Sequence, residues 1–260
     1  MPTVQAAGRT LNYEWVEVGS KAGGAGRPVL VFLHEGLGSI GQWRDFPAAV
    51  SQATGCRALV YDRYGYGQSD VLVEPKRDIS FMHHEALRSL PEFLSRLKVE
   101  NPVLIGHSDG ASIALIHAGA GFPVKAVVAM APHVFIEPIC LSSIRKAAFA
   151  FDSTDLKSRL GKYHRDVKKT FHGWADVWLD PDFVSWDIRD DYLPKIGCPV
   201  LAIQGEDDEY GTMAQLDDTR KRVRRCELLK LPDCGHSPFR DQPERVISAI
   251  KEFAQRQGIS

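Results

Sequence analysis

Short segments of consecutive apolar residues recur along the chain and predict strands that are buried on both faces. Such runs are typical of parallel sheets, because helices cover both faces of the sheet. They occupy residues 28–33, 58–61, 102–105, 126–130, 199–203 and 227–231. Ahead of them, residues 11–18 alternate apolar and polar side chains, which predicts a half-buried strand within an N-terminal hairpin.

Three further segments have the character of helices. Residues 81–97 carry apolar side chains at spacings of three and four, which places them on one helix face. Pro91 lies inside this segment and predicts a kink or a break. Residues 111–121 form a helix of small residues that can pack closely on a sheet, and residues 243–257 close the chain. Strands that alternate with helices predict an α/β fold with a doubly wound, mostly parallel sheet.

Residues 133–196 interrupt this alternation. They contain no convincing strand, have helical character and carry charges of both signs. We therefore expect an insertion between two strands of the sheet, with residues 1–132 and 197–260 forming the core. The tryptophans of the insertion are Trp174, Trp178 and Trp186.

Composition and charge narrow the possible partners. The chain has 260 residues, a length that suits one large α/β sheet as a single domain. Its 32 Lys and Arg residues nearly balance 33 Asp and Glu residues, so no overall field would attract nucleic acid or an anionic membrane. No apolar stretch approaches the roughly 18 residues of a membrane span. The N-terminus lacks the pattern of a signal peptide, so we expect a cytoplasmic protein.

The cysteines argue against a disulfide framework and a structural zinc site. There are five of them, they are scattered, and none belongs to a C-x-x-C pair. Histidines at metal-binding spacing and a glycine-rich phosphate loop are also missing from the sequence. We therefore expect neither a metal nor a cofactor, and the sequence supports no prediction of an oligomeric state.

The strongest chemical motif is Gly-His-Ser-Asp-Gly at residues 106–110. It has the form G-x-S-x-G and lies between a predicted strand and a predicted helix, as a nucleophile elbow requires. A sharp turn at this place exposes the serine hydroxyl above the sheet edge, and flanking glycines permit the close backbone approach. Ser108 is therefore the predicted nucleophile.

A serine nucleophile needs a base, and the base needs an orienting acid. His236 follows the last predicted strand and precedes the last helix, at the sheet edge where open α/β sheets place their sites. Four acidic residues at 206–209 follow the preceding strand. Among them we favour Asp208 as the acid, with Asp207 as the alternative. The chain order Ser, Asp, His is that of one fold class.

The reaction also needs donors for the developing oxyanion. The backbone N–H of Asp109, directly after the nucleophile, is one candidate. The second should come from the glycine-containing loop that follows residues 28–33, where Gly36 is our choice. Its neighbours Glu35 and Leu37 are the alternatives.

Together these motifs resemble the α/β-hydrolase superfamily over nearly the whole chain. The segments that carry the resemblance are the oxyanion loop at 34–38, D-x-x-G-x-G-x-S at 62–69, the elbow at 106–110, and the acid and base loops at 205–208 and 235–238. Two positions depart from the pattern. Glu35 stands where the family usually has glycine, and Asp109 where an apolar residue is common. We expect the Asp109 side chain to point away from the oxyanion, into a hydrogen bond or salt bridge.

The resemblance implies a mostly parallel central sheet flanked by helices, with residues 133–196 as an inserted helical cap. It also implies a pocket under this cap, for which we select Leu37, His133, Trp174 and Trp178. Alternatively, the tryptophans only pin the cap to the sheet, and His133 has a structural or rim role.

The function implied by the resemblance is hydrolysis of small or medium carboxylic esters through an acyl-enzyme on Ser108. A C–C bond hydrolase, a thioesterase, a lactonase, an acyltransferase and a perhydrolase share the same triad. A small-ligand receptor on a hydrolase fold is an alternative of another class. The expected partner is a small-molecule ester or related acyl compound.

Overall fold

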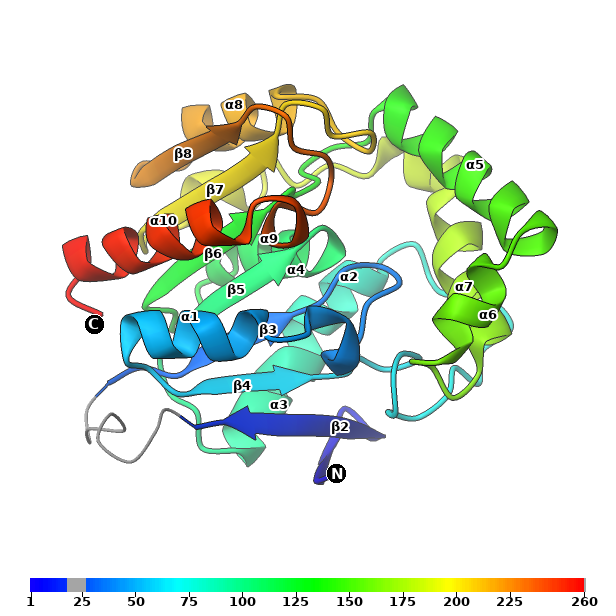
Figure 1. Ribbon diagram of the computed structural model, residues 1–260, viewed down its shortest axis with the longest axis horizontal. Helices are drawn as coiled ribbons and strands as arrows, with labels where there is room; N and C mark the ends of the chain where they lie inside the picture. The colour runs from blue at the N-terminus through cyan, green and yellow to red at the C-terminus, as the bar shows by residue number, and fades with distance from the viewer. Residues whose placement is uncertain (18–26, 260) are drawn as a thin grey trace.

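Eight strands form one sheet in the computed structural model, which describes residues 1–17 and 27–259. The strands are β1 (Thr3–Ala6), β2 (Arg9–Val16), β3 (Leu30–Leu33), β4 (Ala58–Tyr61), β5 (Val103–His107), β6 (Ala126–Met130), β7 (Val200–Gly205) and β8 (Cys226–Leu231). Their order is β1-β2-β4-β3-β5-β6-β7-β8 (Figure 1). The pairs β1–β2 and β2–β4 are antiparallel, and the other described pairs are parallel.

The predicted fold class is therefore confirmed, since this is a mostly parallel sheet flanked by helices. Each of the six apolar runs contains a strand, and β1 with β2 forms the N-terminal hairpin. Val18, the predicted end of the second of these strands, lies outside the described residues. The main differences from the predicted strands lie at strand ends. Strand β5 continues to His107, and β7 continues to Gly205.

Helices cover both faces of the sheet and separate two apolar cores. In β3, Leu30 and Phe32 face one core, while Val31 and Leu33 face the other, as the alternation of side chains in a strand requires. The first core is closed by α1 (Phe46–Thr54), α9 (Pro238–Asp241) and α10 (Pro243–Arg256). The second is closed by α2 (Phe81–His84), α3 (Leu90–Arg96), α4 (Asp109–Gly119) and α8 (Ala214–Arg222). Helices α1, α8 and α9 were not predicted.

The irregularity expected near Pro91 takes the form of a π-helical turn. Residues Glu85–Ser89 form this turn between α2 and α3, and Pro91 lies in the first turn of α3. Proline has no N–H to donate to the carbonyl four residues earlier, so the regular helical ladder cannot run through this point.

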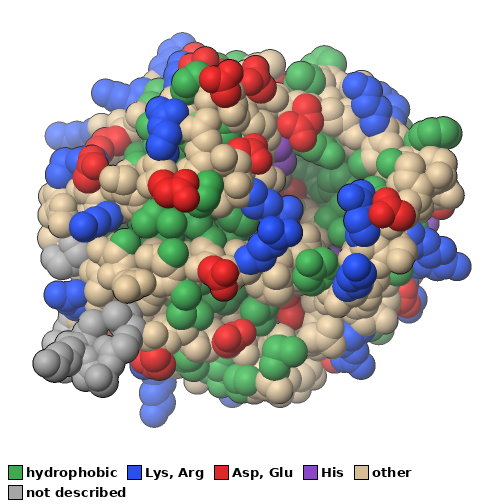
Figure 2. Space-filling view, viewed as in Figure 1, with side chains coloured by type: hydrophobic (Ala, Val, Ile, Leu, Met, Phe, Trp, Pro, Cys, Tyr) green, Lys and Arg blue, Asp and Glu red, His purple; other side chains and the backbone are tan. Residues whose placement is uncertain are grey.

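The segment between β6 and β7 is helical and lies beyond the carboxyl ends of the parallel strands (Figure 1). It comprises α5 (Pro138–Ser153), α6 (Leu156–Gly161), α7 (Val167–Trp178) and the 3₁₀ turns Pro181–Ser185 and Leu193–Lys195. Figure 2 shows a hollow between these helices and the sheet core, with hydrophobic side chains and a histidine visible in it. Within residues 1–17 and 27–259, no helix is long and apolar enough to cross a membrane.

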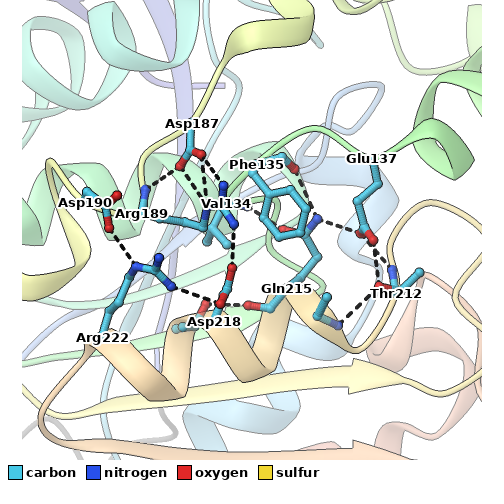
Figure 3. Close-up of polar contacts among 12 residues, drawn as sticks. Val134, Phe135, Glu137, Asp187, Arg189, Asp190, Thr212, Gln215, Asp218 and Arg222 are labelled. Atoms are coloured by element: carbon cyan, nitrogen blue, oxygen red, sulfur yellow. Dashed lines mark hydrogen bonds and ion pairs between the residues drawn. The ribbon is translucent and has the colours of Figure 1, made fainter.

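Helix α8 anchors both ends of this segment (Figure 3). At the entry, the side chain of Gln215 accepts a hydrogen bond from the Val134 N–H at 2.7 Å and donates one to Glu137 at 2.7 Å. At the exit, Arg189 pairs with Asp218 at 2.7 Å. The helical segment is thereby held in a defined position over the sheet edge.

Candidate active site

Ser108 occupies a sharp turn between β5 and α4. Its φ of 52° lies in a region that non-glycine residues rarely adopt. The flanking glycines are required by close packing. A Cβ at Gly106 would overlap the Gly110 carbonyl, and one at Gly110 would overlap the carbonyl of Leu33. The turn brings Ser108 to the wall of a cavity at the sheet edge.

The structure brings Ser108, His236 and Asp208 into one hydrogen-bonded chain. His236 Nε2 lies 2.9 Å from Ser108 Oγ, and His236 Nδ1 lies 2.8 Å from Asp208 Oδ1. The three residues follow the ends of β5, β8 and β7, which meet at one edge because these strands are parallel. Of the two aspartates left open by the sequence, Asp208 is buried against the histidine and Asp207 is exposed.

The hydrogen bonds determine which nitrogen of His236 carries its proton. The ionised carboxylate of Asp208 can only accept, so Nδ1 holds the hydrogen and Nε2 is left to accept from Ser108. Burial alone would lower the pKa of His236, but the contact with Asp208 raises it above the usual value. Burial would raise the pKa of Asp208, and the same contact lowers it. The imidazole is therefore well suited to take up a proton.

The peptide between Glu35 and Gly36 is held in one orientation. Its carbonyl oxygen, that of Glu35, accepts hydrogen bonds from His34 Nδ1 at 2.7 Å and from Arg63 Nη2 at 2.9 Å. In a trans peptide the following N–H points the opposite way. The Gly36 N–H is therefore directed away from Arg63, and it donates to no backbone carbonyl of the described residues.

The other predicted donor, the N–H of Asp109, is the first amide of α4. Amides in the first turn of a helix lack partners within that helix. Gly36, Ser108 and Asp109 all line the same cavity. Among the described residues neither amide donates a hydrogen bond, and both belong to residues that line the cavity together with Ser108.

The Asp109 side chain is buried next to Arg63, with 3.9 Å between its Oδ2 and Arg63 Nη2. Burial raises the pKa of Asp109, and the positive charge of Arg63 offsets part of this effect. The side chain thus lies beside a basic group, as expected. Since Arg63 also binds the Glu35 carbonyl, one guanidinium balances the buried carboxylate and orients the loop.

The Glu35 carboxylate, the other departure from the family pattern, pairs with Arg240 and lies close to the His107 ring. It lies 3.2 Å from Arg240 Nη2 and 3.4 Å from His107 Nδ1. Burial would raise the pKa of Glu35, but these partners hold it well below its usual value. His107 Nε2 in turn donates to the backbone carbonyl of His236 at 2.7 Å. The sequence analysis missed His107 and Arg240, although His107 is the variable residue within G-x-S-x-G.

A cavity of about 240 Å³ opens beside Ser108. All four residues selected from the sequence line it, namely Leu37, His133, Trp174 and Trp178. Trp186 does not, and it packs against Phe183 instead. Burial lowers the pKa of His133 to about 3, so this histidine is neutral.

The sequence analysis missed several residues of the cavity wall, among them Cys140, Ile144, Glu209 and Tyr210. Glu209 and Tyr210 directly follow Asp208, so adjacency to the acid was the available signal. No local signal distinguished Cys140 and Ile144 from the other apolar residues of α5. In the part of the chain that the structure describes, no group of three or more His, Cys, Asp or Glu side chains is placed to hold a metal ion.

Comparisons with known proteins agree with this architecture. A family model described as the alpha/beta hydrolase family matches residues 30–249. The AB hydrolase superfamily protein YisY of Bacillus subtilis is 24% identical over 255 residues, covering 89% of this chain and 92% of that protein.

Solved structures share the fold of this chain. The enol-lactonase from Burkholderia xenovorans LB400 superposes with a TM-score of 0.76 at 17% identity, covering 98% of this chain and 100% of that one. A thermophilic esterase from Thermogutta terrifontis superposes with a TM-score of 0.72 at 20% identity, covering 99% of each chain. Similarity at this level of identity demonstrates a common fold.

Proposed function

Because the chain belongs to the alpha/beta hydrolase family, we propose that it is a serine hydrolase that cleaves small, uncharged carboxylic esters through an acyl-enzyme on Ser108. The observation that carries the proposal is the continuous chain from Ser108 Oγ to His236 at 2.9 Å and from His236 to Asp208 at 2.8 Å. The unpaired amides of Gly36 and Asp109 beside the serine support it.

In the acylation step, His236 Nε2 takes the proton of Ser108 as Oγ attacks the acyl carbon. The carbonyl oxygen becomes an oxyanion, which the N–H groups of Gly36 and Asp109 stabilise. Collapse of this intermediate breaks the ester C–O bond, and His236 returns the proton to the departing alkoxide. A water molecule, deprotonated by His236, then attacks the acyl carbon; the bond to Ser108 Oγ breaks, the acid leaves, and His236 returns the proton to Oγ. Asp208 keeps the imidazole in the required tautomer throughout.

The cavity supports a small and uncharged substrate. Its volume of about 240 Å³ is below the roughly 300–1,000 Å³ of typical ligand pockets. Leu37, Ile144 and the two tryptophans form an apolar wall suited to an acyl chain or ring. Glu35 and Glu209 also line the cavity, and none of its described lining residues is Lys or Arg. An acyl group that carries a carboxylate would therefore be repelled.

In this proposal residues 133–196 act as a cap on a core made of residues 1–132 and 197–260. The cap supplies part of the cavity wall and restricts the access of water to Ser108. Exclusion of water strengthens each electrostatic interaction within the site. The cap residues that line the cavity are His133, Cys140, Ile144, Trp174 and Trp178.

The proposal is tested with p-nitrophenyl esters of increasing acyl length and with a fluorophosphonate probe. The wild-type protein should show sustained turnover that is greatest for short acyl groups, and the probe should label it. Ser108→Ala should lose both turnover and labelling, whereas Ser248→Ala, an exchange on the outer helix α10, should retain both. A single burst without turnover would indicate a receptor, and an active, labelled Ser108→Ala protein would exclude Ser108 as the nucleophile.

A further inference from the structure

The side chain of Trp174 lies directly against the oxyanion loop. It projects from α7, is 7% exposed and lines the cavity together with Gly36 and Ser108. A Cβ built on Gly36 would overlap the indole atoms Nε1 and Cδ1 of Trp174. The edge of the indole that carries the N–H is therefore packed next to the Cα of Gly36. This contact also explains why glycine is needed at position 36.

The indole N–H of Trp174 has no hydrogen-bond partner among the described residues. The indole nitrogens of Trp43, Trp178 and Trp186 also lack one, but they are sealed from solvent. The Trp174 nitrogen is not among these sealed atoms, and its side chain forms part of the cavity wall. Trp174 thus offers an accessible donor in the cavity, on a side chain that is more than nine-tenths buried.

The helix that carries Trp174 is tied to the core next to the same loop. Thr170 in the first turn of α7 donates to the Gly65 carbonyl at 2.8 Å. His164, just before α7, accepts from the Gly67 N–H at 2.9 Å through Nδ1, and its Nε2 donates to the Leu37 carbonyl at 3.0 Å. These contacts hold the indole in a constant position relative to Gly36. A donor that is already in place costs no reorganisation when charge develops in the reaction.

We propose that the indole N–H of Trp174 is a third hydrogen-bond donor to the carbonyl oxygen of the substrate, beside the amides of Gly36 and Asp109. An oxygen bound to the Gly36 N–H lies next to the Gly36 Cα, against which the indole edge that carries the N–H is packed. The hydrogen bond strengthens as the carbonyl oxygen becomes negative in the tetrahedral intermediate. The helical segment would then contribute to the chemistry itself as well as covering the cavity. This inference rests on the proposed ester hydrolysis.

The test removes the N–H and keeps an aromatic side chain. In Trp174→Phe, kcat should fall by roughly tenfold to a hundredfold, the range for a hydrogen bond to a charged group, while KM stays unchanged. Affinity for a trifluoromethyl ketone should fall by the same factor, because its adduct with Ser108 carries the oxyanion. Trp186→Phe removes an unpaired indole N–H from the same segment but away from the cavity, and it should change neither quantity.

A second replacement controls for loss of packing. Benzothienylalanine at position 174 keeps the bicyclic shape but has sulfur in place of N–H, and it should reproduce the loss of kcat. If both replacements leave kcat and the inhibitor affinity unchanged, the inference is wrong. An increase in KM alone would also overturn it, since the indole would then bind another part of the substrate. Failure of the wild-type protein to turn over esters or to be labelled at Ser108 would instead refute the proposed function.

Discussion

Replacing Ser108 by glycine should make the protein more stable than replacing it by alanine, although the proposed function predicts that both variants are inactive. Ser108 has a φ of 52°, and backbone strain at such a position costs about 1–3 kcal/mol for a residue with a Cβ. Alanine keeps the Cβ and therefore the strain, whereas glycine relieves it. Glycine in turn loses about 0.5–1 kcal/mol through the greater freedom of the unfolded chain. The lost hydrogen bond to His236 is common to both variants and cancels.

The free energy of unfolding of Ser108→Gly should therefore exceed that of Ser108→Ala by about 1 kcal/mol. Urea unfolding at equal m-value measures this difference, and the midpoint of thermal unfolding should differ by about 2–4 °C. Ala49→Gly in α1 is the control, because its helical backbone is unstrained. That exchange should lower the free energy of unfolding by about 1 kcal/mol relative to the wild type. If Ser108→Gly is less stable than Ser108→Ala by a similar amount, the elbow stores no strain and the reasoning is refuted.

Three further predictions concern the charges around the site. Asp208→Asn should lower kcat roughly 10⁴-fold, and the acid limb of the remaining kcat/KM profile should move to lower pH. The reason is that the contact raising the pKa of His236 is lost; an unmoved limb in the pH–rate profile would contradict this cause. Arg63→Met leaves the buried Asp109 unpaired and should cost about 3–5 kcal/mol in urea unfolding. The loss should be smaller when Asp109→Asn is added, and additive losses would contradict the pairing. Glu209→Gln should raise kcat/KM several-fold for an ester whose acyl group carries a carboxylate, but not for its neutral counterpart. Equal changes for the two esters would show that cavity charge does not select the substrate.

Much of the sheet and the sharp turn at Ser108 could be read from the sequence because their signals are local. A parallel strand buried on both faces must be apolar at consecutive positions, and β4 and β6 begin and end where their apolar runs do. The elbow must have small residues at Gly106 and Gly110, because backbone atoms occupy the space of a Cβ at both. Such requirements act on neighbouring residues, so they leave a pattern in the sequence that does not depend on the rest of the fold.

Helix α8 could not be predicted from such local signals. Its one large apolar residue is Leu216, and its other buried side chains are the polar Gln215 and Thr219. It therefore lacks the apolar periodicity from which a helix is predicted. The buried Gln215 side chain is held by hydrogen bonds with Val134, Phe135 and Glu137, about 80 residues earlier in the chain.

The sequence by itself determined the types of residue in the candidate site and the order in which they occur. Only the tertiary structure decided which of them meet: Asp208 rather than Asp207 at His236, Arg63 at the Glu35 carbonyl, and Trp174 at Gly36. The physical reason is that each contact joins side chains or loops from different strands and helices. Their directions depend on how the sheet and the helical segment pack, and no spacing along the chain encodes that packing.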